Sequence, residues 1–78
     1  EIEGFKVYPN PASTTINVTT ENPDYDEVRL VNAMGQTIIK KQFHFDAIID
    51  LSVCSKGYYI VALYGGNNIV KRKKIIKK

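Results

Sequence analysis

Polar and apolar residues alternate in short runs along most of the chain. Residues 15–20 read TINVTT and residues 27–32 read EVRLVN, so apolar side chains recur at alternate positions. This period of two is typical of a β-strand with one face buried. Further runs rich in β-branched and aromatic residues cover residues 36–45, 47–52, 57–66 and 69–76, and a short one covers residues 5–8. The pattern predicts about seven strands.

Glycine, proline and asparagine separate these runs at intervals typical of a sandwich of two sheets. We expect positive φ angles at Gly35 and at the pair Gly65 and Gly66, because tight hairpin turns need that conformation. No segment keeps an apolar stripe at helical spacing over the length of a helix. The sequence therefore predicts an all-β fold of antiparallel strands, with one domain at residues 5–78 and a linker remnant at residues 1–4.

The stretch DLSVCSKGYYIV, residues 50–61, contains a sharper pattern. Leu51 is followed by an irregular link, a glycine at Gly57 and a tyrosine at Tyr59 that opens an apolar strand. The spacing resembles the tyrosine corner of Greek-key sandwiches, in which the tyrosine hydroxyl bonds a backbone group a few residues upstream. An ordinary core tyrosine after a hairpin glycine would produce the same letters. With the corner, the prediction becomes an immunoglobulin-like antiparallel β-sandwich of about seven strands.

Two prolines interrupt the first predicted strand in the stretch VYPNPAS, residues 7–13. Pro9 and Pro11 lack an N–H and favour extended conformations in the residues before them, so Asn10 lies in a stiff corner. Such a stretch ends a strand, and its plainest interpretation is a turn between two edge strands.

The composition is that of one small globular domain. The chain has 78 residues, of which 44% are hydrophobic and 24% charged, so a thin core is available and disorder is not expected. No apolar run is long enough to cross a bilayer, and the first residues show no secretory signal. The single cysteine, Cys54, leaves no internal disulfide, and we expect a small buried side chain there rather than a reactive thiol.

Few residues carry recognisable chemistry. His44 could form a metal site with Asp46 and Asp50, but its position favours a histidine that faces water between two buried aromatics, Phe43 and Phe45. The serines lack a nucleophile-elbow context, and the sequence contains no glycine-rich phosphate loop. The sequence predicts no catalytic residue, no cofactor and no metal, and therefore a domain that is not an enzyme.

Positive charge is concentrated at the end of the chain. Residues 71–78 read KRKKIIKK and carry six positive charges, whereas the remainder has a surplus of three negative charges, which gives the net charge of +3. Nucleic acid is not expected as a partner, because the run contains no aromatic residue for base stacking. Two interpretations stay open: attraction to an anionic membrane surface or lipopolysaccharide, and an edge strand protected by lysines with Ile75 or Ile76 turned inward.

Read in order, four of these segments resemble one protein family. They are VYPNPAS at residues 7–13, LVNAMGQTI at 30–38, DLSVCSKGYYIVAL at 50–63 and VKRKKIIKK at 70–78. Together they resemble the C-terminal sorting domain of proteins exported by the type IX, or Por, secretion system, and the resemblance covers residues 5–78. Cys54 lies where this family usually has leucine, and a serine–lysine pair replaces the more usual proline-containing pair before Gly57.

The resemblance implies a transport signal rather than a catalytic activity. A domain of this kind is recognised by the outer-membrane translocon and its shuttle proteins, is removed by a sortase at the cell surface, and leaves its cargo joined to anionic lipopolysaccharide. The ending KIIKK is also similar to that of certain secreted proteases, so a peptidase is one expectation for the cargo. On this interpretation the cleavage site lies near residues 1–4, and the protein passes through the periplasm to the outer-membrane surface or the medium.

The recognition residues that the resemblance implies fall in the same motifs. The last two predicted strands would offer unpaired backbone groups to the translocon, and their lysines would steer them toward an acidic receptor surface. Exposed edge strands would also allow a dimer. The residues expected to be recognised by translocon or sortase are Pro9, Asn10, Pro11, Gly35, Gly57, Tyr59, Gly65, Gly66, Lys71, Lys73, Lys74, Ile75, Ile76, Lys77 and Lys78.

Two other functions are compatible with the sequence: a passive immunoglobulin-like spacer, and a carbohydrate- or lipopolysaccharide-binding module of an extracellular enzyme. Sugar binding usually needs exposed aromatic platforms. The chain has no tryptophan, and Tyr8, Tyr25, Tyr58 and Tyr64 are scattered along it, so the sequence predicts no flat aromatic row.

Overall fold

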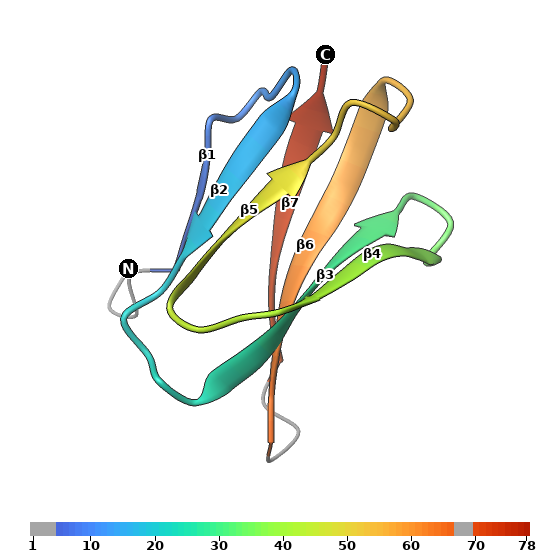
Figure 1. Ribbon diagram of the computed structural model, residues 1–78. Coiled ribbons are helices and arrows are strands. Elements are labelled where there is room, and N and C mark those ends of the chain that lie inside the picture. The colour runs from blue at the N-terminus through green and yellow to red at the C-terminus, as the bar shows by residue number, and fades with distance from the viewer. Residues whose placement is uncertain (1–4, 67–69) are drawn as a thin grey trace.

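Seven β-strands make up the computed structural model, which describes residues 5–66 and 70–78 (Figure 1). Those residues contain no helix, and hence none long and apolar enough to span a membrane. The predicted linker remnant at residues 1–4 lies outside them. The strands are β1 (Lys6–Tyr8), β2 (Thr15–Thr19), β3 (Tyr25–Asn32), β4 (Thr37–Gln42), β5 (Asp46–Asp50), β6 (Gly57–Gly65) and β7 (Val70–Lys77).

The strands form two antiparallel sheets. One has three strands in the order β1-β2-β5, and the other has four in the order β4-β3-β6-β7. The chain therefore changes sheet after β2, after β4 and after β5, as Figure 1 shows. This arrangement confirms the predicted all-β, immunoglobulin-like sandwich of about seven strands.

Alternate residues of the strands fill the space between the sheets. The period of two places Ile16 and Val18 on one face of β2, and Val28 and Leu30 on one face of β3. All four are completely buried in one apolar cluster. Burial of such a side chain contributes about 1.5–3 kcal/mol, so these positions supply the main driving force for folding. The other completely buried large members are Ile49, Leu51, Val61, Leu63 and Ile75.

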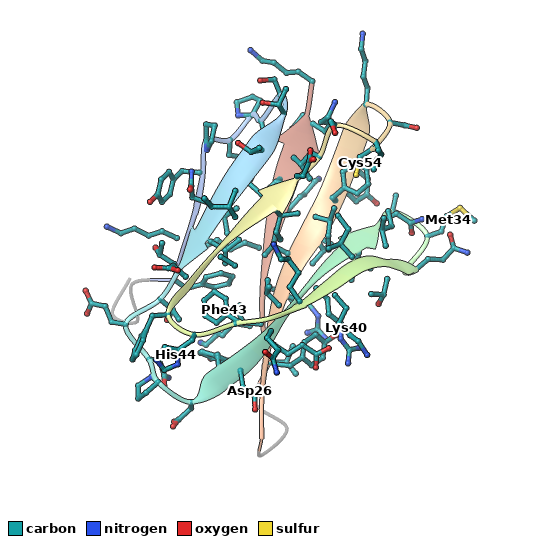
Figure 2. The ribbon with its side chains drawn as sticks, viewed as in Figure 1. Asp26, Met34, Lys40, Phe43, His44 and Cys54 are labelled. Carbon is teal, nitrogen blue, oxygen red and sulfur yellow. The ribbon has the colours of Figure 1, made fainter. Side chains whose placement is uncertain are left out.

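The strand predicted over residues 36–45 is shorter in the structure. β4 ends at Gln42 and β5 begins at Asp46, because the chain leaves one sheet here and joins the other. Phe43 is buried, but Phe45 is 38% exposed with a φ of 69°, so the expectation of two buried aromatics is wrong at Phe45. His44 is exposed, as expected (Figure 2). Its ring centroid lies 4.7 Å from that of Phe45.

The predicted turn glycines differ in conformation. Gly35 closes the β3–β4 hairpin with a φ of 87°, as expected, and its N–H donates to the carbonyl oxygen of Asn32 at 3.0 Å. The Asn32 side-chain oxygen accepts two further backbone N–H groups of the same turn. Gly65 is the last residue of β6, and the φ of Gly66 is not positive, so the expectation of a positive-φ pair is wrong at Gly66.

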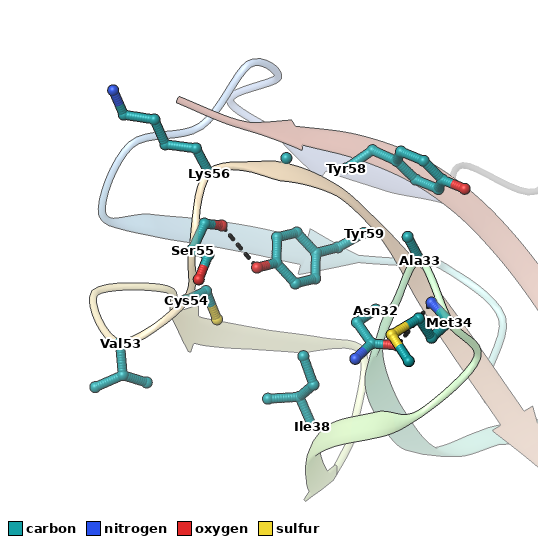
Figure 3. Close-up of a pocket in the computed structure, with 11 residues that line it drawn as sticks. Asn32, Ala33, Met34, Ile38, Val53, Cys54, Ser55, Lys56, Tyr58 and Tyr59 are labelled. Carbon is teal, nitrogen blue, oxygen red and sulfur yellow. Dashed lines mark hydrogen bonds between the residues drawn. The ribbon is translucent and has the colours of Figure 1, made fainter.

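The tyrosine corner is present. The Tyr59 hydroxyl donates a hydrogen bond of 2.6 Å to the carbonyl oxygen of Ser55, four residues upstream (Figure 3). Leu51 is completely buried ahead of the link, and Gly57 has a φ of 139°, a conformation that residues with side chains rarely adopt. The corner is therefore confirmed. It joins the link before β6 to the beginning of that strand.

Removing the corner hydroxyl should destabilise the sandwich. We expect Tyr59→Phe to lower the free energy of unfolding by about 1 kcal/mol, the usual net value of one such hydrogen bond. Chemical denaturation measures this change. Tyr58→Phe is the matched control, because Tyr58 lies one residue away with its side chain 43% exposed on the other face of β6, and it should shift the free energy by less than about 0.5 kcal/mol. Equal stabilities for the two variants would contradict a stabilising corner.

Candidate recognition site at the C-terminal strand

β7 is an edge strand of the four-stranded sheet. It pairs with β6 alone within that sheet, from Val70 opposite Tyr64 to Lys77 opposite Gly57. In an antiparallel ladder the backbone groups of alternate residues point to opposite sides. The odd-numbered residues of β7 therefore bond β6, and the even-numbered ones direct their N–H and C=O groups outward.

A segment from the other end of the chain covers part of that outward edge. The Asn10 side chain accepts the N–H of Ile76 at 3.0 Å and donates to the carbonyl oxygen of Lys74 at 3.3 Å. The Ala12 N–H donates to the carbonyl oxygen of Ile76, and its own carbonyl accepts the N–H of Lys78, both at 2.8 Å. We call these four hydrogen bonds the terminal clamp. Figure 1 shows the loop after β1 lying beside the C-terminal end of β7.

The sequence of the loop explains the form of the clamp. Pro9 and Pro11 have no N–H to donate, so a regular backbone ladder is not available in this segment. Asn10, placed between them, substitutes its side-chain amide for a backbone donor and acceptor. Ala12, the first residue after the prolines, supplies the backbone pair and forms a parallel bridge with Lys77. The proline-rich stretch connects β1 to β2, which is the central strand of its sheet, so the interpretation of a turn between two edge strands is wrong for β2. The stretch also pairs with the last strand.

The charges of the tail are divided between two faces of β7. Lys71, Lys73 and Lys77 share a face with the buried Ile75, whereas Arg72 and Lys74 lie on the opposite face with Ile76, which is 42% exposed. The Lys73 ammonium lies 5.7 Å from the centre of the Phe5 ring, and the Lys74 ammonium lies 4.5 Å from that of Tyr58. The run KRKKIIKK therefore does not form a single basic patch, and of the two isoleucines it is Ile75 that turns inward.

The structure brings most of the predicted recognition residues to one end of the sandwich. Gly57 lies opposite Lys77, Tyr59 lies opposite Ile75, and the clamp adds the Pro9–Pro11 segment to the same strand end. Gly65, Gly66 and Lys71 lie at the other end of β6 and β7, about 25 Å along the strand from Gly57. The exposed members of the first group lie next to one another at this end, with Tyr59 and Ile75 buried beneath them, and the second group does not join them.

A hollow beside the corner was not foreseen. It has a volume of about 480 Å³ and is lined by the β3–β4 turn and by the link before β6 (Figure 3). Met34 and Val53, which border it, are 80% and 87% exposed, and Ile38 is the extra residue of a β-bulge between β3 and β4. Met34 and Val53 are apolar residues in turns, where polar residues are usual, and this feature of the sequence could have indicated the hollow.

The remaining candidates have structural roles. Cys54 is partly buried against the core, and this burial raises the pKa of its thiol, as expected for a small packed side chain. The Asp50 carboxylate accepts the N–H of Ser52, which lowers the pKa of Asp50. Within residues 5–66 and 70–78, His44 and Asp46 belong to no group of three or more side chains that could hold a metal.

Comparison with known proteins gives one family and two enzymes. The model of the family described as the secretion system C-terminal sorting domain matches residues 6–78. The chain is 31% identical over 75 residues to an endo-acting ulvan lyase of Formosa agariphila, and 32% identical over 74 residues to beta-agarase D of Zobellia galactanivorans. These matches cover 94% and 95% of this chain but only 14% and 15% of the two relatives.

Among solved structures, the chain is similar to CopC from Methylosinus trichosporium OB3b. The TM-score is 0.50, and the match covers 94% of this chain and 81% of that one. Because the sequence identity is 12%, this likeness concerns the fold alone.

The clamp predicts a specific change in backbone protection. In Asn10→Ala, the amide of Ile76 loses its acceptor, so its hydrogen exchange should become about fivefold faster. Exchange measured by NMR tests this. Asn17→Ala is the control, because the Asn17 side chain bonds the carbonyl oxygen of Tyr8, in the other sheet, and should leave Ile76 unchanged. Equal exchange at Ile76 in both variants would show that the clamp does not protect β7.

Proposed function

The chain belongs to the family of secretion system C-terminal sorting domains, and we propose that its folded surface is read by the type IX outer-membrane translocon and its shuttle proteins. Its family makes it a non-catalytic sorting domain of an exported protein. The match to residues 6–78, nearly the whole sandwich, is the observation that carries the proposal.

The surface proposed for recognition is the strand end at which the motifs meet. Three segments far apart in the sequence contribute to it: the Pro9–Pro11 loop, the corner glycine Gly57, and the residues from Ile76 to Lys78. Tyr59 and Ile75 would support this surface from the core. A receptor that contacts this end would require a correctly folded sandwich, because no single segment contains the whole surface. Lys71 and Lys73 continue the charged side of β7 away from it and would steer association with an acidic receptor.

Cleavage of the domain would separate it from its cargo. A sortase would cut near residues 1–4; Phe5 is already 2% exposed and β1 begins at Lys6, so a cut there would leave the described sandwich whole. The cargo would then be retained at the cell surface, joined to anionic lipopolysaccharide, or released. The two enzymes that share this domain support an enzyme as cargo, whereas nothing in their names favours the peptidase suggested by the ending KIIKK.

Export of a reporter tests the proposal. Residues 1–78, fused to the C-terminus of a periplasm-targeted fluorescent protein in a bacterium with the type IX apparatus, should deliver the reporter to the surface. Sequencing the N-terminus of the released domain should place the cut upstream of Lys6. An intact, folded fusion that stays in the periplasm would contradict the sorting function and favour a passive spacer.

The division of the tail charges allows a sharper test in the same fusion. Lys71→Gln/Lys73→Gln/Lys77→Gln should reduce surface delivery at least about tenfold. These three side chains lie on the face of β7 that carries Ile75, in a row that ends at the proposed recognition surface. Arg72→Gln/Lys74→Gln is the control on the opposite face and should export normally. The reverse result would move recognition to the outer face. Deleting residues 71–78 is a weaker test, because it also removes Ile75 from the core.

A further inference from the structure

The outer face of the four-stranded sheet carries an amphipathic strip along β6. Tyr58, Ile60, Ala62 and Tyr64 occupy alternate positions and therefore point to the same side, opposite to the buried Tyr59. Tyr58 and Tyr64 lie about 20 Å apart at the two ends of the strip. Tyr58 and Tyr64 therefore share one face of the sheet, although the sequence predicts no flat aromatic row.

A row of cations crosses the middle of the strip. Lys40 of β4 lies opposite Arg29 of β3. Ala62 lies between Arg29 and Arg72, which are its partners in the two flanking strands. Like charges directly opposite one another destabilise a sheet, so the Lys40–Arg29 pair is unfavourable for folding unless it is neutralised.

One carboxylate, that of Glu27, pairs with part of this row, and the row keeps a net positive charge. Glu27 accepts a hydrogen bond from the Arg29 guanidinium at 2.9 Å and lies 3.9 Å from the Lys40 ammonium. The bond from Arg29 lowers the pKa of Glu27, so the pair stays ionised at neutral pH. Lys74 lies on the same face, opposite Ile60, so the described strands carry four cations and one carboxylate there; Asp26 lies in a bulge at the start of β3.

Two of these cations, Arg29 and Arg72, line a shallow groove with an apolar floor. Its volume is about 510 Å³, and Arg29 and Arg72 line it together with Val31, Ile60 and both tyrosines of the strip. The Arg29 guanidinium lies over the Tyr64 ring, 4.2 Å from its centre, which holds it in place beside Ala62. Among the described residues, the Arg72 side chain has no ion pair and no hydrogen bond, so it is available to a ligand.

From this arrangement we infer that the outer face binds an anionic polysaccharide, a chain of sugars that carry carboxylate or sulfate groups. Charge complementarity selects a polyanion, and two guanidiniums on either side of Ala62 can bind one or two acidic groups in a bidentate manner. The apolar floor and the tyrosine edges fit the C–H faces of sugar rings. The surface is separate from the strand end proposed for sorting.

An acidic peptide fits this face less well. Residues 58–64 lie in the middle of the sheet, where the backbone groups of β6 are bonded to β3 and β7, so no edge is available for strand addition. A peptide would have to bind through carboxylates on flexible stems and would lose their rotamer freedom. Acidic groups fixed to a rigid sugar ring avoid most of that loss.

Titration of the 78-residue chain with defined polymers tests the inference. We expect calorimetry to show binding to polygalacturonate and to dextran sulfate, with none to neutral dextran and much weaker binding to poly-L-glutamate. Arg29→Gln/Arg72→Gln should weaken polygalacturonate binding about tenfold or more. Lys6→Gln/Lys56→Gln removes the same charge from exposed positions elsewhere and should change the affinity less than about twofold.

Three outcomes would overturn the inference. They are no binding to either anionic polysaccharide, equal losses in the two double variants, and binding to poly-L-glutamate as tight as to polygalacturonate. The single variant Arg72→Gln is a control for misfolding, because it removes no hydrogen bond or ion pair described within the fold. It should still weaken polygalacturonate binding severalfold. Failure here would leave export of the reporter unaffected, and failure of export would leave this binding unaffected.

Discussion

The structure depends on pairing between the two ends of the described chain. Residues 10–12 and the end of β7 are more than sixty positions apart, yet four hydrogen bonds join them. Without that contact, the last strand would be held mainly by its pairing with β6 and by the burial of Ile75. The clamp places the proline-rich loop, the tyrosine corner and the end of β7 next to one another.

The period of two in β6 and β7 gives the domain two chemically distinct surfaces. In β6 it separates a buried face from an amphipathic outer one, and in β7 it separates Lys71, Lys73 and Lys77 from Arg72 and Lys74. A basic run that looks uniform in the sequence thereby serves different sides of the sandwich. If both proposals hold, substitutions only one residue apart would change sorting and polysaccharide binding separately.

Local patterns predicted much of the fold, and contacts between distant segments account for what they missed. The corner at Tyr59 and the turn at Gly35 are each encoded within a few residues, so the sequence predicted the turn and offered the corner as one of two interpretations. The exposure of Phe45 depends on the chain changing sheet there, which alternation alone does not reveal. The partner of Asn10 also required the topology. By contrast, the shared face of Tyr58 and Tyr64 follows from their even spacing and was available from the sequence.

The parallel direction of the bridge between Ala12 and Lys77 determines how the domain responds to force. If a cargo pulls on the N-terminal side while a receptor holds the last strand, the two paired segments are drawn in opposite directions along their own axes. The four bonds of the clamp are then loaded in shear and share the tension, instead of opening one after another as in a peeled hairpin. The joint between the chain ends is thus oriented to resist traction across a membrane.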